Sequence, residues 1–276
     1  MEAPRTLPDG LLVAWYGDDY TGAAAVMEVL AFAGLPAVLF FEPPSPEQLA
    51  RFPGIRGLGI AGAARARSPA WMERHLPPVF RYLAGLGAPV THYKICSTLD
   101  SAPHLGSIGK AIDLALEALP ADWVPLLTAA PAVGRYQAFG TLFASSATGV
   151  HRLDRHPVMA RHPVTPMTEA DVTRHLAAQT ARPIGLVALN ALQDGATADA
   201  ALAEARRADA EIVALDVVDD RTEAASGRLI WEQGGPRVLV AGSQGVEYAL
   251  IRHWSEAGLL APPEPPPHPA PVAHLP

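Results

Sequence analysis

The stretch WYGDDYTGAAAVMEVLAFAG, residues 15–34, decides the fold class that we predict for this chain. A hydrophobic run, 11–16, leads into a glycine and two adjacent aspartates, and an alanine-rich segment with helical spacing follows. This order predicts a buried strand, a tight turn and a helix whose N-cap is Thr21. Ligands of open α/β sheets bind at such turns, so Asp18 and Asp19 are candidate functional residues. The alternative is that they only complement the positive end of the helix dipole, although one carboxylate would suffice for that.

Short apolar runs alternate with helical patterns over most of the chain. We expect strands at 11–16, 37–41, 57–61, 90–95, 124–128, 184–189, 211–216 and 237–241, and helices at 22–33, 69–85, 107–118, 169–180, 197–209, 221–233 and 244–257. This alternation predicts an α/β fold of three layers, a mostly parallel sheet with helices on both faces. The last three strands and their helices indicate a regular βαβ unit. Residues 129–167 are weakly periodic and indicate a long functional loop.

Composition excludes several classes of protein. Lysine and arginine number 21 against 28 aspartate and glutamate residues, and the resulting charge of −7 argues against a nucleic-acid partner. No apolar run approaches a membrane span and the N-terminus lacks the hydrophobic core of a signal peptide, so we expect a cytoplasmic protein without a membrane partner. Cys96 is the only cysteine, which excludes an internal disulfide and a thiol-ligated metal site.

The C-terminal end differs in composition from the rest. Residues 262–276 are rich in proline and can form neither a helix nor a sheet ladder. We therefore expect one folded domain over residues 1–258 and a linker or tail over 259–276. The proline-rich segment is either an extended spacer or a plain loose terminus.

A second polar cluster lies in HYKICSTLDSAPHLGSIGKAID, residues 92–113. The strand at 90–95 leads to a turn that contains four polar side chains: Ser97, Thr98, Asp100 and Ser101. The glycine-bearing segment 106–109 then starts a helix, whose free N–H groups attract negative charge. Together with the cation of Lys94, these groups suit a polyhydroxylated anionic ligand. The alternative is that they are ordinary turn and cap residues.

Two further segments contain candidate anion-binding groups. Arg135 follows a strand end and a glycine, where it suits a bidentate grip on carboxylate or phosphate, or else a surface ion pair. Between residues 151 and 163 three arginines face one aspartate, and this basic island with its histidines favours an anionic small molecule. The histidine spacings do not match a helical metal pair, so we expect no metal there.

Two segments further along the chain have mainly structural interpretations. Thr168 and Asp171 form a helix-capping pattern, and the turn at 242–245 is either an anion site or a tight connection.

Five blocks in this order resemble the four-carbon acid sugar kinase family across about residues 11–258: GDDYTGA, KICSTLDSAPHLGSIGKAID, PAVGRYQAFG, RHPVTPMTEAD and VLVAGSQGVEYAL. The resemblance implies phosphorylation of an acid sugar such as threonate, erythronate or 3-oxo-tetronate, with ATP and Mg²⁺ as cofactors. It also implies an N-terminal substrate-binding domain and a C-terminal nucleotide-binding domain. Many members have D-S-T-x-R-G-N in the second block, so CSTLDSAPHLGS indicates a divergent subgroup with its own acid sugar.

The resemblance also implies roles for individual residues. It makes Asp18 and Asp19 the catalytic candidates, without deciding between them. It places Thr21, Ser97, Thr98, Asp100, Ser101 and Arg135 in the substrate cleft. The cation of Lys94 and the basic island add Lys94, Arg155 and His162 as substrate-binding candidates. No segment matches the glycine-rich ATP domain, so we expect a substrate-binding half that is inactive alone, and a homo-oligomer remains open. One alternative is a non-catalytic acid-sugar-binding or regulatory protein. Another, an Asp-dependent phosphohydrolase, needs one residue between its two aspartates, which are adjacent here.

Overall fold

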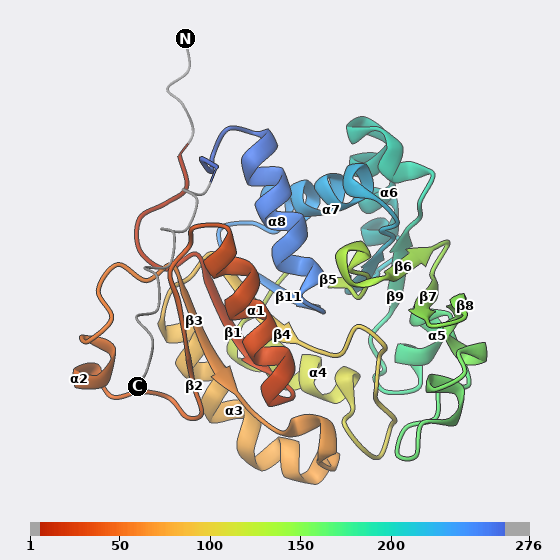
Figure 1. Ribbon diagram of the computed structural model, residues 1–276, viewed down its shortest axis with the longest axis horizontal. Coiled ribbons are helices and arrows are strands. Elements are labelled where there is room, and N and C mark those ends of the chain that lie inside the picture. The colour runs from red at the N-terminus through yellow and green to blue at the C-terminus, as the bar shows by residue number, and fades with distance from the viewer. Residues whose placement is uncertain (1–5, 263–276) are drawn as a thin grey trace, which may run out of the picture.

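The computed structural model describes residues 6–262, and within them the chain folds around an eight-stranded sheet (Figure 1). Its strands are β1 (Val13–Gly17), β2 (Ala37–Phe40), β3 (Gly57–Ala61), β4 (Val90–Lys94), β5 (Val124–Leu127), β9 (Ile184–Val187), β10 (Ile212–Leu215) and β11 (Val238–Gly242). They lie in the order β2-β3-β1-β4-β11-β5-β10-β9, and every pair is parallel. The α/β class predicted from the sequence is confirmed.

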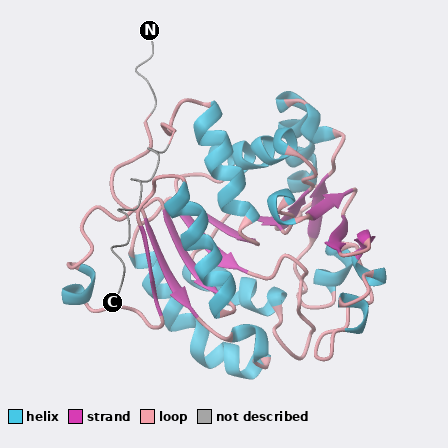
Figure 2. Ribbon diagram, viewed as in Figure 1, coloured by secondary structure: helices cyan, strands magenta, loops and turns pink. Residues whose placement is uncertain are grey.

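Side chains that alternate along β1 divide the core into two layers. Ala14 and Tyr16 belong to the layer formed with α3 (Pro69–Gly85), α4 (Ile108–Ala118) and the short α5 (Val172–Ala177). Val13 and Trp15 belong to the opposite layer, formed with α1 (Tyr20–Phe32), α6 (Gly195–Arg207), α7 (Asp220–Gln233) and α8 (Gly245–Glu256). Helices therefore cover both faces of the sheet (Figure 2). The remaining short helices are α2 (Pro46–Leu49), η1 (Ala64–Ala66), η2 (Pro131–Val133), η3 (Leu153–Arg155), η4 (Met159–Arg161) and η5 (Ala191–Gln193).

Trp15 fixes the position of the turn that follows β1. Its indole is fully buried, and Nε1 donates a hydrogen bond to the carbonyl of Ala23 in α1 at 3.0 Å. The ring lies over β3 so closely that a Cβ at Gly59 would be 2.1 Å from the indole Cε2. Glycine is therefore required at this point of β3, and the start of α1 is held tightly against the sheet.

Within residues 129–167, which we predicted to be one long loop, residues 135–152 form a second sheet, whereas residues 153–167 contain no strand and only the short helices η3 and η4. Strands β6 (Arg135–Ala138), β7 (Thr141–Ser146) and β8 (Gly149–Arg152) pair in antiparallel fashion. Asp216, at the end of β10, is fully buried and accepts hydrogen bonds from Gln137 Nε2 at 3.1 Å and Gly140 N at 3.0 Å. These bonds attach the small sheet to the carboxyl edge of the large one.

Three local expectations are wrong. Helix α1 begins at Tyr20 and its N-cap is Asp19, whose carboxylate accepts from Gly22 N at 2.8 Å, so Thr21 is not the cap. The N-cap of α5 is Asp171, and not Thr168, at which the predicted capping pattern begins. Strand β11 pairs with β4 and β5, so it is not a neighbour of β10 and the last three strands are no single βαβ unit.

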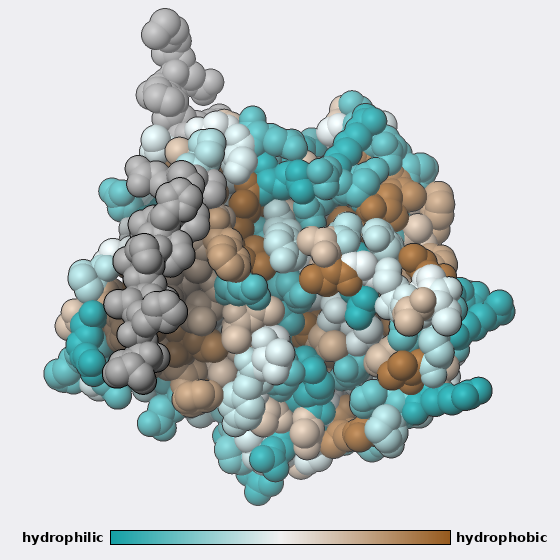
Figure 3. All heavy atoms as spheres, in the orientation of Figure 1, coloured by the Kyte–Doolittle hydropathy of each residue, from teal (hydrophilic) through white to brown (hydrophobic). Residues whose placement is uncertain are grey.

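The two leucines after the expected boundary at residue 258 contact the end of α8 and its core layer. The N–H groups of Leu259 and Leu260 donate to the carbonyl of Trp254 at 2.7 and 3.1 Å, and both side chains pack against the second core layer. Residues 263–276, most of the expected tail, lie outside the described residues. On the face in Figure 3 hydrophobic residues form small groups among hydrophilic ones, and none of the described helices is long and apolar enough to cross a bilayer.

Candidate active site

A pocket of about 300 Å³ opens at the carboxyl ends of β1, β3 and β4. From β1 the chain continues through α1 to β2 on one side, whereas from β4 it continues through α4 to β5 on the other. The order of strands thus reverses here, and ligands of open α/β sheets bind at such points. The lining residues are Asp18, Asp19, Tyr20, Gly62, Ala63, Arg65, Ala66, Asp100, His162, Val164 and Thr165.

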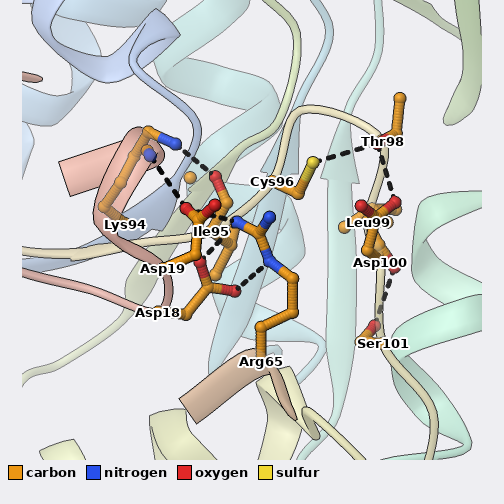
Figure 4. Close-up of polar contacts among 12 residues, drawn as sticks. Asp18, Asp19, Arg65, Lys94, Ile95, Cys96, Thr98, Leu99, Asp100 and Ser101 are labelled. Atoms are coloured by element: carbon orange, nitrogen blue, oxygen red, sulfur yellow. Dashed lines mark hydrogen bonds and ion pairs between the residues drawn. The ribbon is translucent and has the colours of Figure 1, made fainter. Parts of the chain in front are cut away.

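Arg65 joins the two aspartates of the turn after β1 (Figure 4). Its guanidinium forms a bidentate pair with Asp18, with Nη2–Oδ1 at 2.6 Å and Nε–Oδ2 at 3.2 Å. The same Nη2 lies 2.9 Å from Oδ1 of Asp19. Backbone bonds fix this arrangement, because Arg65 N donates to the carbonyl of Asp18 and Asp18 N to that of Lys94, both at 3.0 Å. Segments after three adjacent strands therefore build one charged cluster.

Burial sets the electrostatics of this cluster. Asp18 is only 1% exposed, and burial raises the pKa of its carboxyl, while the charges of Arg65 and Lys94 oppose that rise. Burial alone would lower the pKa of Arg65, yet the charge and hydrogen bonds of Asp18 raise it overall, so the guanidinium stays charged. Burial likewise lowers the pKa of Lys94, whose Nζ donates to the carbonyl of Ile95 at 2.7 Å. Asp18 and Lys94 are thus buried charged groups next to the pocket, where Asp18 holds Arg65 in place.

Asp19 and Arg65 keep groups available to a ligand. The Asp19 carboxylate is 31% exposed, and the described residues donate to its Oδ1 but not to Oδ2. Arg65 is 22% exposed, and its Nη1 has no hydrogen-bond partner among residues 6–262. The pocket therefore offers a carboxylate oxygen that can accept from a hydroxyl and a guanidinium nitrogen that can donate to a carboxylate.

A third carboxylate reaches the pocket from the turn after β4. Thr98 Oγ1 donates its proton to Asp100 Oδ1 at 2.7 Å and accepts from Cys96 Sγ at 3.0 Å (Figure 4). Leu99 between them has a φ of +53°, a left-handed conformation that non-glycine residues seldom adopt. This turn presents Asp100 to the pocket and directs Ser101 away from it, where Ser101 Oγ lies 2.9 Å from His175 Nε2.

Of the eleven residues predicted from the sequence, four line this pocket: Asp18, Asp19, Asp100 and His162. The lining does not include Thr21, Lys94, Ser97, Thr98, Ser101, Arg135 or Arg155. Lys94 and Thr98 contact lining residues or their neighbours, as described above, whereas Thr21 and Arg155 are exposed. Arg135 does not converge with Asp18, because its Nη1 donates to the carbonyls of its own turn, Val133 and Gly134, at 3.1 Å.

Arg65 is the charged residue of the pocket lining that the sequence did not lead us to predict. The signal was present, since AGAARARS begins at the end of the predicted strand 57–61 and places arginines at the same sheet edge as Asp18. The first arginine enters the pocket, and the next, Arg67, lies over the ring of Trp71 instead.

The expectation of a free helix N-terminus at 106–109 is wrong. The side chain of Gln179 accepts from Ile108 N at 2.7 Å and Gly109 N at 3.4 Å, so these N–H groups are occupied. The turn at 242–245 is a tight connection, because a Cβ at Gly245 would lie 1.9 Å from the carbonyl oxygen of Ala129. Neither segment offers the anion site that its glycines suggested.

The described residues contain no group of three or more His, Cys, Asp or Glu side chains arranged to hold a metal ion. Asp18 and Asp19 are adjacent, but three of their four carboxylate oxygens accept hydrogen bonds from the guanidinium of Arg65. The pocket by itself thus fits a hydroxylated organic acid better than a bare cation, and no Mg²⁺ site can be assigned to these residues.

The fold is an α/β domain with a small, charged pocket at the carboxyl edge of its sheet, the edge at which open α/β sheets bind ligands. A family model described as a sugar-binding N-terminal domain matches residues 13–250. A 3-oxo-isoapionate kinase of Paraburkholderia graminis is 51% identical over 257 residues, which cover 92% of this chain and 54% of that protein. A 3-oxo-tetronate kinase of Cupriavidus necator is 30% identical, with coverage of 92% and 57%.

A solved structure from Salmonella typhimurium LT2 matches the fold with a TM-score of 0.78 at 26% identity, covering 90% of this chain and 56% of that one. The chain therefore belongs to the sugar-binding N-terminal domains of the four-carbon acid sugar kinase family. It spans about half the length of the curated relatives that it matches.

Proposed function

We propose that this chain supplies the substrate-binding half of a kinase that phosphorylates an acid sugar with ATP. The observation that supports this most is that one small pocket contains an acceptor, Asp19 Oδ2, and a donor, Arg65 Nη1, neither of which has a hydrogen-bond partner among residues 6–262. A polyhydroxy acid offers the matching groups, hydroxyls that donate and a carboxylate that accepts. With a volume of about 300 Å³, the pocket is at the small end of ligand sites, as a sugar acid requires.

Relatives narrow the choice of substrate. The 51% identity to a 3-oxo-isoapionate kinase makes 3-oxo-isoapionate the first candidate, and 3-oxo-tetronate, threonate and erythronate follow. In this proposal Arg65 binds the carboxylate of the acid, because a guanidinium already fixed by Asp18 loses little entropy when it binds a second anion. Asp100 accepts from a hydroxyl on the opposite side of the molecule.

Asp19 is the better candidate for the general base of the two adjacent aspartates. Both oxygens of Asp18 accept from Arg65, and the side chain is almost fully buried, so Asp18 serves as a positioning residue. Asp19 is exposed to the pocket and retains an unoccupied oxygen among the described residues. In a phosphoryl transfer it would orient the attacking hydroxyl and accept its proton.

ATP and Mg²⁺ are proposed to bind mainly to the part of the longer relatives that this chain does not span. Phosphoryl transfer needs donors and cations around the γ-phosphate, and among the described residues that line the pocket Arg65 is the one arginine or lysine. We therefore expect the 276-residue chain to bind an acid sugar and to show no ATP turnover alone. The cleft is then open on one side, so its affinity should be weak.

Calorimetric titration of the chain with 3-oxo-isoapionate, 3-oxo-tetronate, threonate and erythronate tests this function. We expect one of these acids to bind and Arg65→Ala and Asp19→Asn to abolish the heat of binding. Arg67→Ala, which removes an equal charge two residues away and outside the pocket, is the matched control. If the parent chain binds none of the acids, the proposal is wrong.

A fusion decides between the kinase and the non-catalytic alternative. Joining the chain to the C-terminal half of the Paraburkholderia graminis relative should restore ATP-dependent phosphorylation of the acid that binds. If the fusion folds and binds both acid and nucleotide without turnover, the chain is a binding or regulatory protein instead.

A further inference from the structure

The segment RHPVMARHPVT, residues 155–165, contains the sequence RHPV twice, six residues apart. In both copies the histidine ring closes a turn of the backbone. His156 Nδ1 accepts from Val158 N and Met159 N, both at 3.2 Å. His162 Nδ1 accepts from Val164 N at 3.4 Å and Thr165 N at 3.0 Å. The repeat thus has one local structure, in which a histidine receives the N–H groups two and three residues further on.

This turn fixes the tautomer of each ring. A nitrogen that accepts from backbone N–H groups cannot itself bear a proton, so a neutral imidazole must bear its proton on Nε2. Each histidine is therefore a hydrogen-bond donor through Nε2, and the backbone determines this before any ligand binds.

The two histidines have different surroundings. His156 is buried, and its Nε2 lies 3.4 Å from the carbonyl oxygen of Ser145 in β7, so the first copy anchors the segment to the small sheet. His162 is half-buried and lines the same pocket as Asp19 and Arg65, together with Thr165 of its own turn. Its Nε2 has no hydrogen-bond partner among residues 6–262.

We propose that His162 is a specificity-determining residue that donates an Nε2–H hydrogen bond to an oxygen of the bound acid sugar, with His156 as its structural counterpart. This inference rests on the proposed function and deepens it. Arg65 and His162 would donate hydrogen bonds to carboxylate or carbonyl oxygens of the acid, which can only accept. Asp19 and Asp100 would accept hydrogen bonds from its hydroxyls.

Replacement of each histidine by asparagine separates the two roles. Asparagine Oδ1 can accept the same two N–H groups and keep the turn, but it has nothing in the place of Nε2. His162→Asn should weaken binding of the acid by about 10- to 100-fold and leave the melting temperature unchanged. His156→Asn should lower the melting temperature and leave the dissociation constant within about twofold, since only the anchor to Ser145 is lost.

Failure of this inference differs from failure of the proposed function. If the parent chain binds the acid and His162→Asn binds it equally well, His162 is not a substrate donor and the inference is overturned. If the parent chain binds none of the acids, both are overturned. A second readout needs no ligand: the ¹⁵N spectrum of labelled imidazoles should show His162 protonated at Nε2 and not at Nδ1, and the reverse tautomer would contradict the geometry.

Discussion

Replacing Arg65 by alanine would leave Asp18 buried without its main partner. The guanidinium makes two hydrogen bonds to Asp18, which is 1% exposed, and a third contact to Asp19. Removing one member of a fully buried ion pair costs about 3–5 kcal/mol. Arg65 is 22% exposed and the ammonium of Lys94 remains nearby, so we expect a smaller loss, about 2–3 kcal/mol at neutral pH.

The pH dependence of this loss identifies its cause. Burial already raises the pKa of Asp18 above its value in an unfolded chain, and without Arg65 that pKa rises further. A carboxyl whose pKa is higher in the folded state destabilises the fold most above that pKa, and the penalty shrinks as falling pH protonates it. The cost of Arg65→Ala should therefore be smaller at about pH 5 than at about pH 7.

Urea unfolding followed by tryptophan fluorescence measures this, because Trp15 and Trp254 are fully buried. Asp18→Asn in the Arg65→Ala background removes the stranded charge and should recover most of the lost stability. A penalty below about 0.5 kcal/mol, or one that does not change with pH, would refute the view that Arg65 exists to neutralise Asp18.

Other variants test the fold and the boundary of the site. Gly59→Ala brings a methyl group into the indole of Trp15 and should cost about 3 kcal/mol in urea unfolding; an unchanged midpoint would show that the ring moves freely. Asp216→Asn should lower the free energy of unfolding by about 2 kcal/mol and speed amide hydrogen exchange in the small sheet more than in the large one. An equal increase in both sheets would contradict the role of Asp216 in attaching the small sheet. Arg135→Ala should weaken acid binding far less than Arg65→Ala does, and an equal loss by calorimetry would place Arg135 in the site.

The large sheet could be predicted because its strands are buried on both faces. Runs such as 57–61 and 237–241 are apolar almost throughout and closely match β3 and β11. The small sheet could not, since β7 is only partly buried and its attachment depends on Asp216, far away in sequence. The order of the strands could not be predicted from local sequence patterns either, because β11 lies between β4 and β5 through pairing with residues far away in sequence.

The site was predictable as far as it follows strand ends. Asp18, Asp19 and Asp100 come shortly after β1 and β4, and the carboxyl ends of adjacent parallel strands meet at one edge. Whether a side chain then faces the pocket depends on contacts with residues far away in sequence, which local sequence patterns do not predict. Ser101 is held away by a residue of α5, 74 positions along the chain, and Arg65 becomes a site residue only because β3 pairs with β1.

The structure of this chain with 3-oxo-isoapionate bound tests the central claim most directly. The acid should lie in the pocket after β1, with its carboxylate on Arg65 Nη1, a hydroxyl on Asp19 Oδ2 and an oxygen on His162 Nε2. A well-defined acid bound elsewhere, for instance beside Arg135 or Arg155, with the pocket unchanged, would contradict the assignment of this pocket as the substrate site.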